Sequence, residues 1–121
     1  MGRLVGAYAT SHTAMIIRKF EPDNEVHAAI HEAFAQVRAE VDRLAPDVLV
    51  VIGSEHLNSF SYDSFPQICI GIGDTATGWG DGGVASAELP LAGDFAAQLL
   101  ADGVAAGFDL AFSANPKIDH A

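Results

Sequence analysis

Three of the five histidines follow stretches of the chain that are predicted to form buried β-strands. They are His12 after Leu4–Ala9, His56 after Val48–Ile52 and His120 after Phe108–Phe112. Neutral imidazole is a good ligand for iron, zinc and copper. In open α/β sheets, ligands bind just beyond the carboxyl ends of the strands. If the three strands are parallel, we expect these histidines to face one crevice.

Two histidines and one carboxylate that leave coordination positions open are typical of non-haem Fe(II) oxygenases. His12 and His56 are the candidate imidazole ligands, and Glu55 is the candidate carboxylate. Because adjacent residues are poorly placed to bind one ion in a facial set, we expect Glu55 to have an orienting role instead. His27 and His31 have metal-compatible spacing on a predicted helix, but no third ligand is near them, and we interpret them as a solvated flank.

The central element is predicted to be a strand at Val48–Ile52. All five of its residues are apolar and four are β-branched, which is typical of a strand buried on both faces of a parallel sheet. Before it, the apolar residues of Glu25–Leu44 recur with helical spacing, and Pro46 ends that helix. With a first strand at Leu4–Ala9, this order predicts a right-handed βαβ unit with parallel strands.

The second half of the chain is predicted to continue the α/β pattern. Its expected elements are a strand at Gln67–Ile72, a glycine-rich loop at Gly71–Gly83, a helix at about Gly93–Ala106 and a strand at Phe108–Phe112. Cys69 lies in an apolar run, so we interpret it as a core residue and not as a nucleophile. The prediction for residues 1–121 is a single α/β domain, a three-layer sandwich with a mostly parallel sheet flanked by helices.

Composition excludes several classes of partner. The formal net charge of −10, with only six basic residues, argues against binding of nucleic acid, which needs clustered Lys and Arg. No apolar run reaches the length of a membrane span, and the N-terminus lacks the apolar region of a signal peptide. The single cysteine fits a reducing compartment, so we expect a cytoplasmic protein that binds neither nucleic acid nor membrane.

Several short motifs occur in a fixed order along the chain. They are Ser11-His12, Glu55–Phe60 with Tyr62-Asp63, Ile70–Gly73, Glu88–Pro90 and Ile118–His120. As an ordered set they resemble the N-terminal half of the class III (LigB-type) extradiol ring-cleavage dioxygenases, nearest to the dihydroxyphenylpropionate dioxygenases and the protocatechuate 4,5-dioxygenase beta subunit. The resemblance covers essentially the whole chain. Glu55 departs from it, because the family usually has Asp there.

The resemblance implies a cofactor, an activity and roles for the three histidines. His12 and His56 would bind Fe(II), and His120 would lie beside the substrate as the catalytic residue that transfers protons. The activity would be the cleavage of a catechol-type aromatic ring with O2, an oxidoreductase reaction of aromatic compound catabolism. A histidine side chain with a pKa near neutral pH is suited to such proton transfer.

The family has two further active-site residues beyond this stretch, a glutamate that completes the iron triad and a second histidine that acts as base. Residues 1–121 contain no match to them, so the resemblance implies either a fragment of a longer enzyme or a site completed by another chain, in a homo-oligomer or with a complementing subunit. Two alternatives stay open. One is a non-catalytic, Memo-like binding or signalling member of the superfamily, and the other is a zinc-dependent α/β hydrolase.

Overall fold

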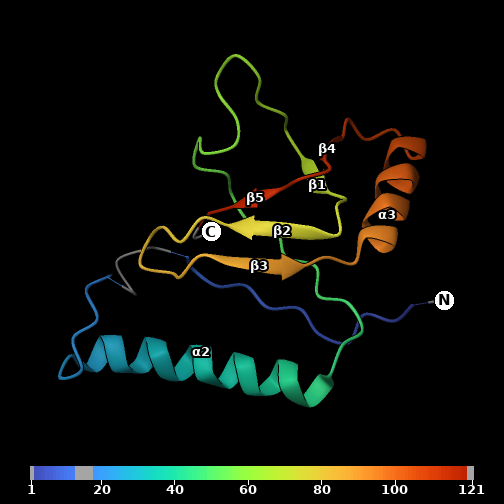
Figure 1. The fold of residues 1–121 in the computed structure, drawn as a ribbon. Helices are drawn as coiled ribbons and strands as arrows, with labels where there is room; N and C mark the ends of the chain where they lie inside the picture. Colours follow the sequence, from blue (N-terminus) through green and yellow to red (C-terminus); the bar gives the residue numbers. More distant parts are fainter. Residues whose placement is uncertain (1, 13–17, 120–121) are drawn as a thin grey trace. The chain divides into compact units, whose positions relative to one another are not determined.

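The computed structural model describes residues 2–12 and 18–119, and the chain divides into two compact units, Met1–Ile52 and Gly53–Ala121 (Figure 1). The described elements in chain order are α2 (Glu25–Leu44), β1 (Cys69–Gly71), β2 (Thr75–Gly78), β3 (Ala87–Pro90), α3 (Gly93–Ala105), β4 (Ala111–Ser113) and β5 (Lys117–Ile118).

Helix α2 has the bounds that its apolar periodicity predicts. It begins after Asn24, whose side-chain oxygen accepts hydrogen bonds from the amides of Val26 at 3.0 Å and His27 at 3.3 Å. Such a cap satisfies amide groups that have no partner inside the helix. The helix ends where Ala45 adopts a left-handed conformation with φ of 43°, directly before Pro46. The predicted helix and both of its ends are confirmed.

The two strands predicted on either side of α2 are not formed. Leu4–Ala9 and Val48–Ile52 belong to no strand among the described residues, although Gly6 lies close enough to α2 that a Cβ there would be 3.1 Å from the Leu44 side chain. Ile52 is 93% exposed, so the prediction of a strand buried on both faces was wrong. A strand must share its backbone hydrogen bonds with neighbouring strands. None of the described strands pairs with these runs, so the predicted βαβ unit is absent as well.

The second unit contains two small sheets with mostly parallel pairing. In the first, β1 pairs in parallel with β4, so that Cys69 lies opposite Ala111. In the second, which has the order β3-β2-β5, strand β2 is antiparallel to β3 and parallel to β5. These parallel strands and the helices confirm an α/β fold. Strand β1 lies inside its predicted range, whereas β4 begins three residues later than predicted.

The glycine-rich stretch Gly71–Gly83 is not wholly a loop, and that prediction was wrong. Its Thr75–Gly78 segment forms β2, the middle strand of the three-stranded sheet. Threonine favours extended structure, and Ala76 between the two threonines is fully buried. The turn from β2 to β3 instead uses the glycines that follow, because Gly80 has a φ of 74° that other residues rarely adopt.

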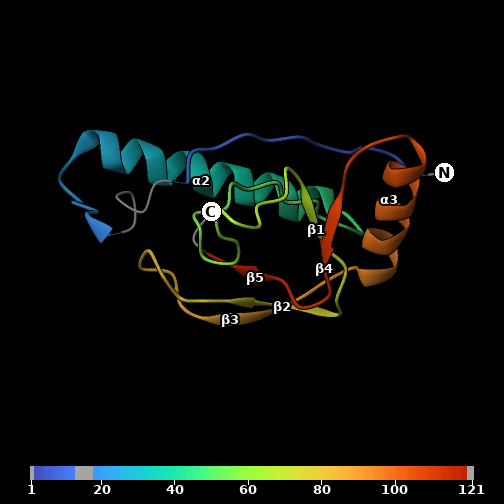
Figure 2. The same ribbon diagram turned by 90° about the horizontal axis from the view of Figure 1, so that it is seen from above.

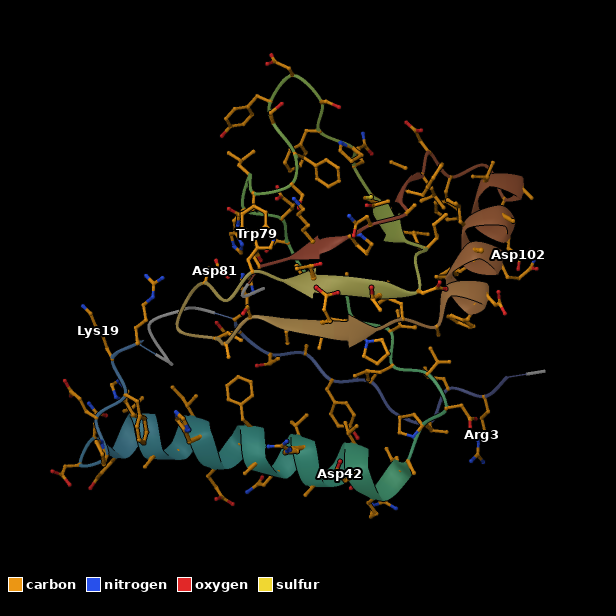
Figure 3. The ribbon with its side chains drawn as sticks, in the orientation of Figure 1. Arg3, Lys19, Asp42, Trp79, Asp81 and Asp102 are labelled. Atoms are coloured by element: carbon orange, nitrogen blue, oxygen red, sulfur yellow. The ribbon has the colours of Figure 1, made fainter. Side chains whose placement is uncertain are left out.

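Helix α3 is confirmed close to its predicted bounds and lies beside β1 and β4 (Figure 2). A Cβ at Gly103 would come within 2.5 Å of the Leu110 side chain, so this glycine allows the helix to approach the chain leading into β4. Asp102 accepts a hydrogen bond from Gln98 at 2.8 Å on the side of α3 away from the strands (Figure 3). Within residues 2–12 and 18–119, neither helix combines the length and the apolar character needed to cross a membrane.

Candidate functional site

The loop that follows Val48–Ile52 is organised by one carboxylate. The side chain of Glu55 accepts hydrogen bonds, each of 2.6 Å, from the backbone amides of Leu57, Asn58 and Ser59. These three hydrogen bonds fold the loop around the carboxylate. Within the loop, Leu57 has a left-handed backbone conformation with a φ of 62°. Glu55 therefore fixes the backbone that follows His56, and its orienting role toward a metal site stays a prediction.

The same contacts change the acidity of Glu55. Desolvation raises the pKa of this carboxyl. The hydrogen bonds from the amides of Ser59, Leu57, Asn58 and Phe60 together lower it by more than desolvation raises it, so the pKa lies below its ordinary value of 4.5. Hydrogen bonds to the charged form of a carboxyl group have this effect. The folded loop therefore favours the ionised form of Glu55.

Replacing Glu55 by Gln should destabilise the protein in a pH-dependent way. Because the folded-state pKa is below the unfolded value, the ionised carboxylate stabilises the fold above about pH 4.5, and this contribution is lost as the pH falls through the folded-state pKa. The Tm difference between wild type and Glu55→Gln should be largest near neutral pH and should shrink in acid. Glu88→Gln, at an exposed position on β3, is the control and should show no such trend. A Tm difference for Glu55→Gln that is constant with pH would contradict this assignment.

The ring of His56 is held by a residue from the far end of the second unit. His56 Nδ1 lies 3.0 Å from Oδ2 of Asp119, which is 63 residues away in the sequence. The same oxygen accepts a hydrogen bond from the side-chain amide of Asn58 at 2.9 Å. The Asp119 side chain is only 5% exposed, whereas that of His56 is 36% exposed. A largely buried carboxylate thus binds the inner side of a ring that is partly open to solvent.

Strand β5 carries Asp119 to this position. Its last residue, Ile118, accepts a hydrogen bond from the amide of Trp79 at 3.0 Å, and the Lys117 ammonium lies 5.9 Å from the centre of the Trp79 ring. Figure 3 shows Trp79 and Asp81 where the chain leaves β2. The hydroxyl of Ser59 donates to the Lys117 carbonyl at 3.3 Å, a second link between the loop and β5.

This geometry suits a metal-binding histidine. An ionised carboxylate can only accept hydrogen bonds, so a neutral His56 ring would donate its Nδ1–H to such a partner and keep the lone pair on Nε2. Metal-ligating histidines commonly donate their other N–H to a carboxylate in this manner. Within the described part of the chain, no group of three or more His, Cys, Asp and Glu side chains could hold a metal ion. Among the described residues, the feature that bears on metal binding is thus the imidazole of His56, oriented by Asp119.

The structure does not test where the other two predicted site residues lie relative to His56. His12 is exposed at the end of segment 2–12 in the first unit, whereas His56 lies in the second, so their convergence on one ion stays a prediction. His120, the predicted catalytic residue, lies outside the described residues. Its neighbour Asp119 is the site residue that the sequence reasoning missed, and the only signal for it was its place in the Asp-His motif.

The pair His27 and His31 has a structural setting. His27 Nδ1 accepts a hydrogen bond from the amide of Glu21 at 3.1 Å, and the ring of His31 lies 4.1 Å from that of Phe20, centre to centre. Both histidines thus contact the segment that leads into α2, while His31 is exposed and His27 is only partly buried. Cys69 is partly buried, and burial raises the pKa of its thiol, which opposes a nucleophilic role at neutral pH.

Comparisons with known proteins give similar relatives over most of the chain. One of them is a 2,3-dihydroxyphenylpropionate/2,3-dihydroxicinnamic acid 1,2-dioxygenase of Paraburkholderia phymatum. The two proteins are 37% identical over 101 residues, and this aligned region is 84% of the present chain. Proteins of the same name are 34% identical over 96% of the chain in a Rhodococcus species and 31% identical over 93% in Klebsiella pneumoniae. The resemblance to ring-cleavage dioxygenases is thereby confirmed.

The relatives are much longer than this chain. The matched regions span 31% of the Paraburkholderia protein, 36% of the Rhodococcus protein and 35% of the Klebsiella protein. No protein-family model matches the chain. The chain therefore spans about a third of the length of the curated relatives that it matches.

Proposed function

We propose that the chain forms the N-terminal part of the catalytic domain of an Fe(II)-dependent extradiol dioxygenase, which cleaves a catechol-type ring with O2. The observation that carries the proposal is the His56–Asp119 pair, an oriented imidazole in a chain that is similar to proteins named as dioxygenases. The complete enzyme is this chain together with the remaining length represented in its relatives, on the same chain or on another. The single cysteine supports a cytoplasmic location.

His12 and His56 would hold the Fe(II) through imidazole nitrogens, with a carboxylate from the remaining length as third ligand. When bound, Fe(II) supplies open coordination positions at which both hydroxyl oxygens of a catechol and O2 can be brought together. The residues of this chain do the positioning. Glu55 holds the loop, Asp119 holds the His56 ring, and His120 would move a proton to or from the substrate oxygens.

The complete enzyme is first reconstituted with Fe(II) under anaerobic conditions. The test is then its consumption of O2. On addition of 2,3-dihydroxyphenylpropionate and air, we expect one O2 to be consumed per diol, since both atoms enter the ring-opened product. An enzyme reconstituted with Zn(II) should be inactive, because zinc has no accessible redox change. A purified protein that carries zinc and hydrolyses esters or amides, or one that consumes no O2 with any catechol, would overturn the proposal.

A further inference from the structure

The roles predicted for the three site histidines do not account for the contacts that the Asp119 side chain makes. Asp119 is nearly buried, and its Oδ2 accepts two hydrogen bonds from the same loop, one from the ring of His56 and one from the amide of Asn58. Burying a carboxylate is unfavourable unless its oxygens are bound by donors. These two donors satisfy the oxygen, and they also tie the loop at residues 55–59 to the residue that follows β5.

We propose that Asp119 is the positioning residue of the metal centre: it sets the tautomer and the ring orientation of His56, with Nε2 directed to the iron. This inference rests on the proposed function and deepens it. Rotation of the imidazole about its Cβ–Cγ bond would exchange the positions of Nδ1 and Cδ2, so a single acceptor on Nδ1 selects one of two ring orientations. The bond to Asn58 keeps that acceptor in place.

The loop is held from two directions, and the two carboxylates have separate tasks. Glu55 accepts hydrogen bonds from backbone amides, among them those of Leu57, Asn58 and Ser59, and so determines the path of the chain. Asp119 binds two side chains of the loop, those of His56 and Asn58, and so acts on the orientation of the His56 ring. Loss of Glu55 should affect stability first, whereas loss of Asp119 should affect metal binding first.

Asp119→Ala in the complete enzyme tests the proposal with two measurements. Selective ¹⁵N-histidine labelling reports the His56 tautomer without metal, with the signal assigned by its loss in His56→Gln. We expect the Nδ1–H form in wild type and a mixture of tautomers in Asp119→Ala. Anaerobic titration with Fe(II) should give binding about 10- to 100-fold weaker than wild type, the usual effect of losing such a partner. Asp109→Asn, at an exposed position before β4, is the control and should match wild type in both measurements.

Asp119→Asn is the second variant, and it serves if Asp119→Ala fails to fold. It keeps an oxygen acceptor but removes the charge, and charge-assisted hydrogen bonds are about twice as strong as neutral ones. Its Fe(II) affinity should therefore fall between wild type and Asp119→Ala. An unchanged tautomer and wild-type Fe(II) affinity in a folded variant would overturn the role of Asp119. A wild-type enzyme that binds no Fe(II) would instead overturn the proposed function. In that case the His56 tautomer, measured without metal, still tests whether Asp119 orients the ring.

Discussion

Replacing His56 by Ala in the complete enzyme should abolish iron retention, and His12→Ala should do the same. Each change would remove one of the three protein ligands proposed for the iron, and the loss should exceed the roughly 10- to 100-fold that is typical for a partner outside the metal's own ligand set. Iron content after gel filtration, measured by atomic absorption, is the readout. The ring of His56 is oriented by Asp119, whose Oδ2 lies 3.0 Å from Nδ1 of the histidine.

His31→Ala is the matched control for these variants, because it removes an imidazole whose ring contacts Phe20 in the first unit. It should keep the iron content of wild type. Full iron occupancy in both His12→Ala and His56→Ala would refute the ligand assignment. Loss of iron in His56→Ala alone would remove His12 from the site and leave His56 in it.

His120→Ala should leave the iron bound and lower turnover by roughly 10²- to 10⁴-fold, the usual contribution of a general acid–base. The reason is the division of roles that the family resemblance implies, in which this histidine lies beside the substrate and transfers protons. The measurement is kcat for a catechol at saturating O2, together with iron content of the same preparation.

The two measurements on His120→Ala separate three outcomes. Retained iron with a large loss of kcat supports the proton-transfer role. Loss of iron would make His120 a ligand, and unchanged turnover would make it a bystander. His27→Ala is a suitable control, since His27 is bound through Nδ1 to the amide of Glu21 at the start of α2.

Local features of the fold could be predicted from the sequence because their causes are local. Helix α2 follows from the apolar periodicity along its own length, its Asn24 cap and the proline after it, and all of these signals lie within the helix or next to its ends. Strand β2 was missed for a related reason. The glycines around it indicate a loop, whereas its strand character depends on pairing with Leu89 and Lys117, which are far along the chain.

The failures at Leu4–Ala9 and Val48–Ile52 have the same origin. Their composition predicts burial, but burial requires other strands to pair with them, and composition does not specify such partners. The candidate site contains one feature that the sequence predicts and one that it does not. His56 could be singled out from the run before it, but its contact with Asp119 joins residues 63 positions apart, and no local pattern predicts such a pair.

The exposed run Val48–Ile52 has a consequence for the life of the chain in the cell. It is a charge-free, mostly β-branched segment, and Val51 and Ile52 are 74% and 93% exposed. Unpaired segments of this kind are templates for strand addition between molecules and for aggregation. During synthesis this run leaves the ribosome well before the segment that carries Asp119. Chaperone binding or early pairing with another strand would protect the run from aggregation in that interval.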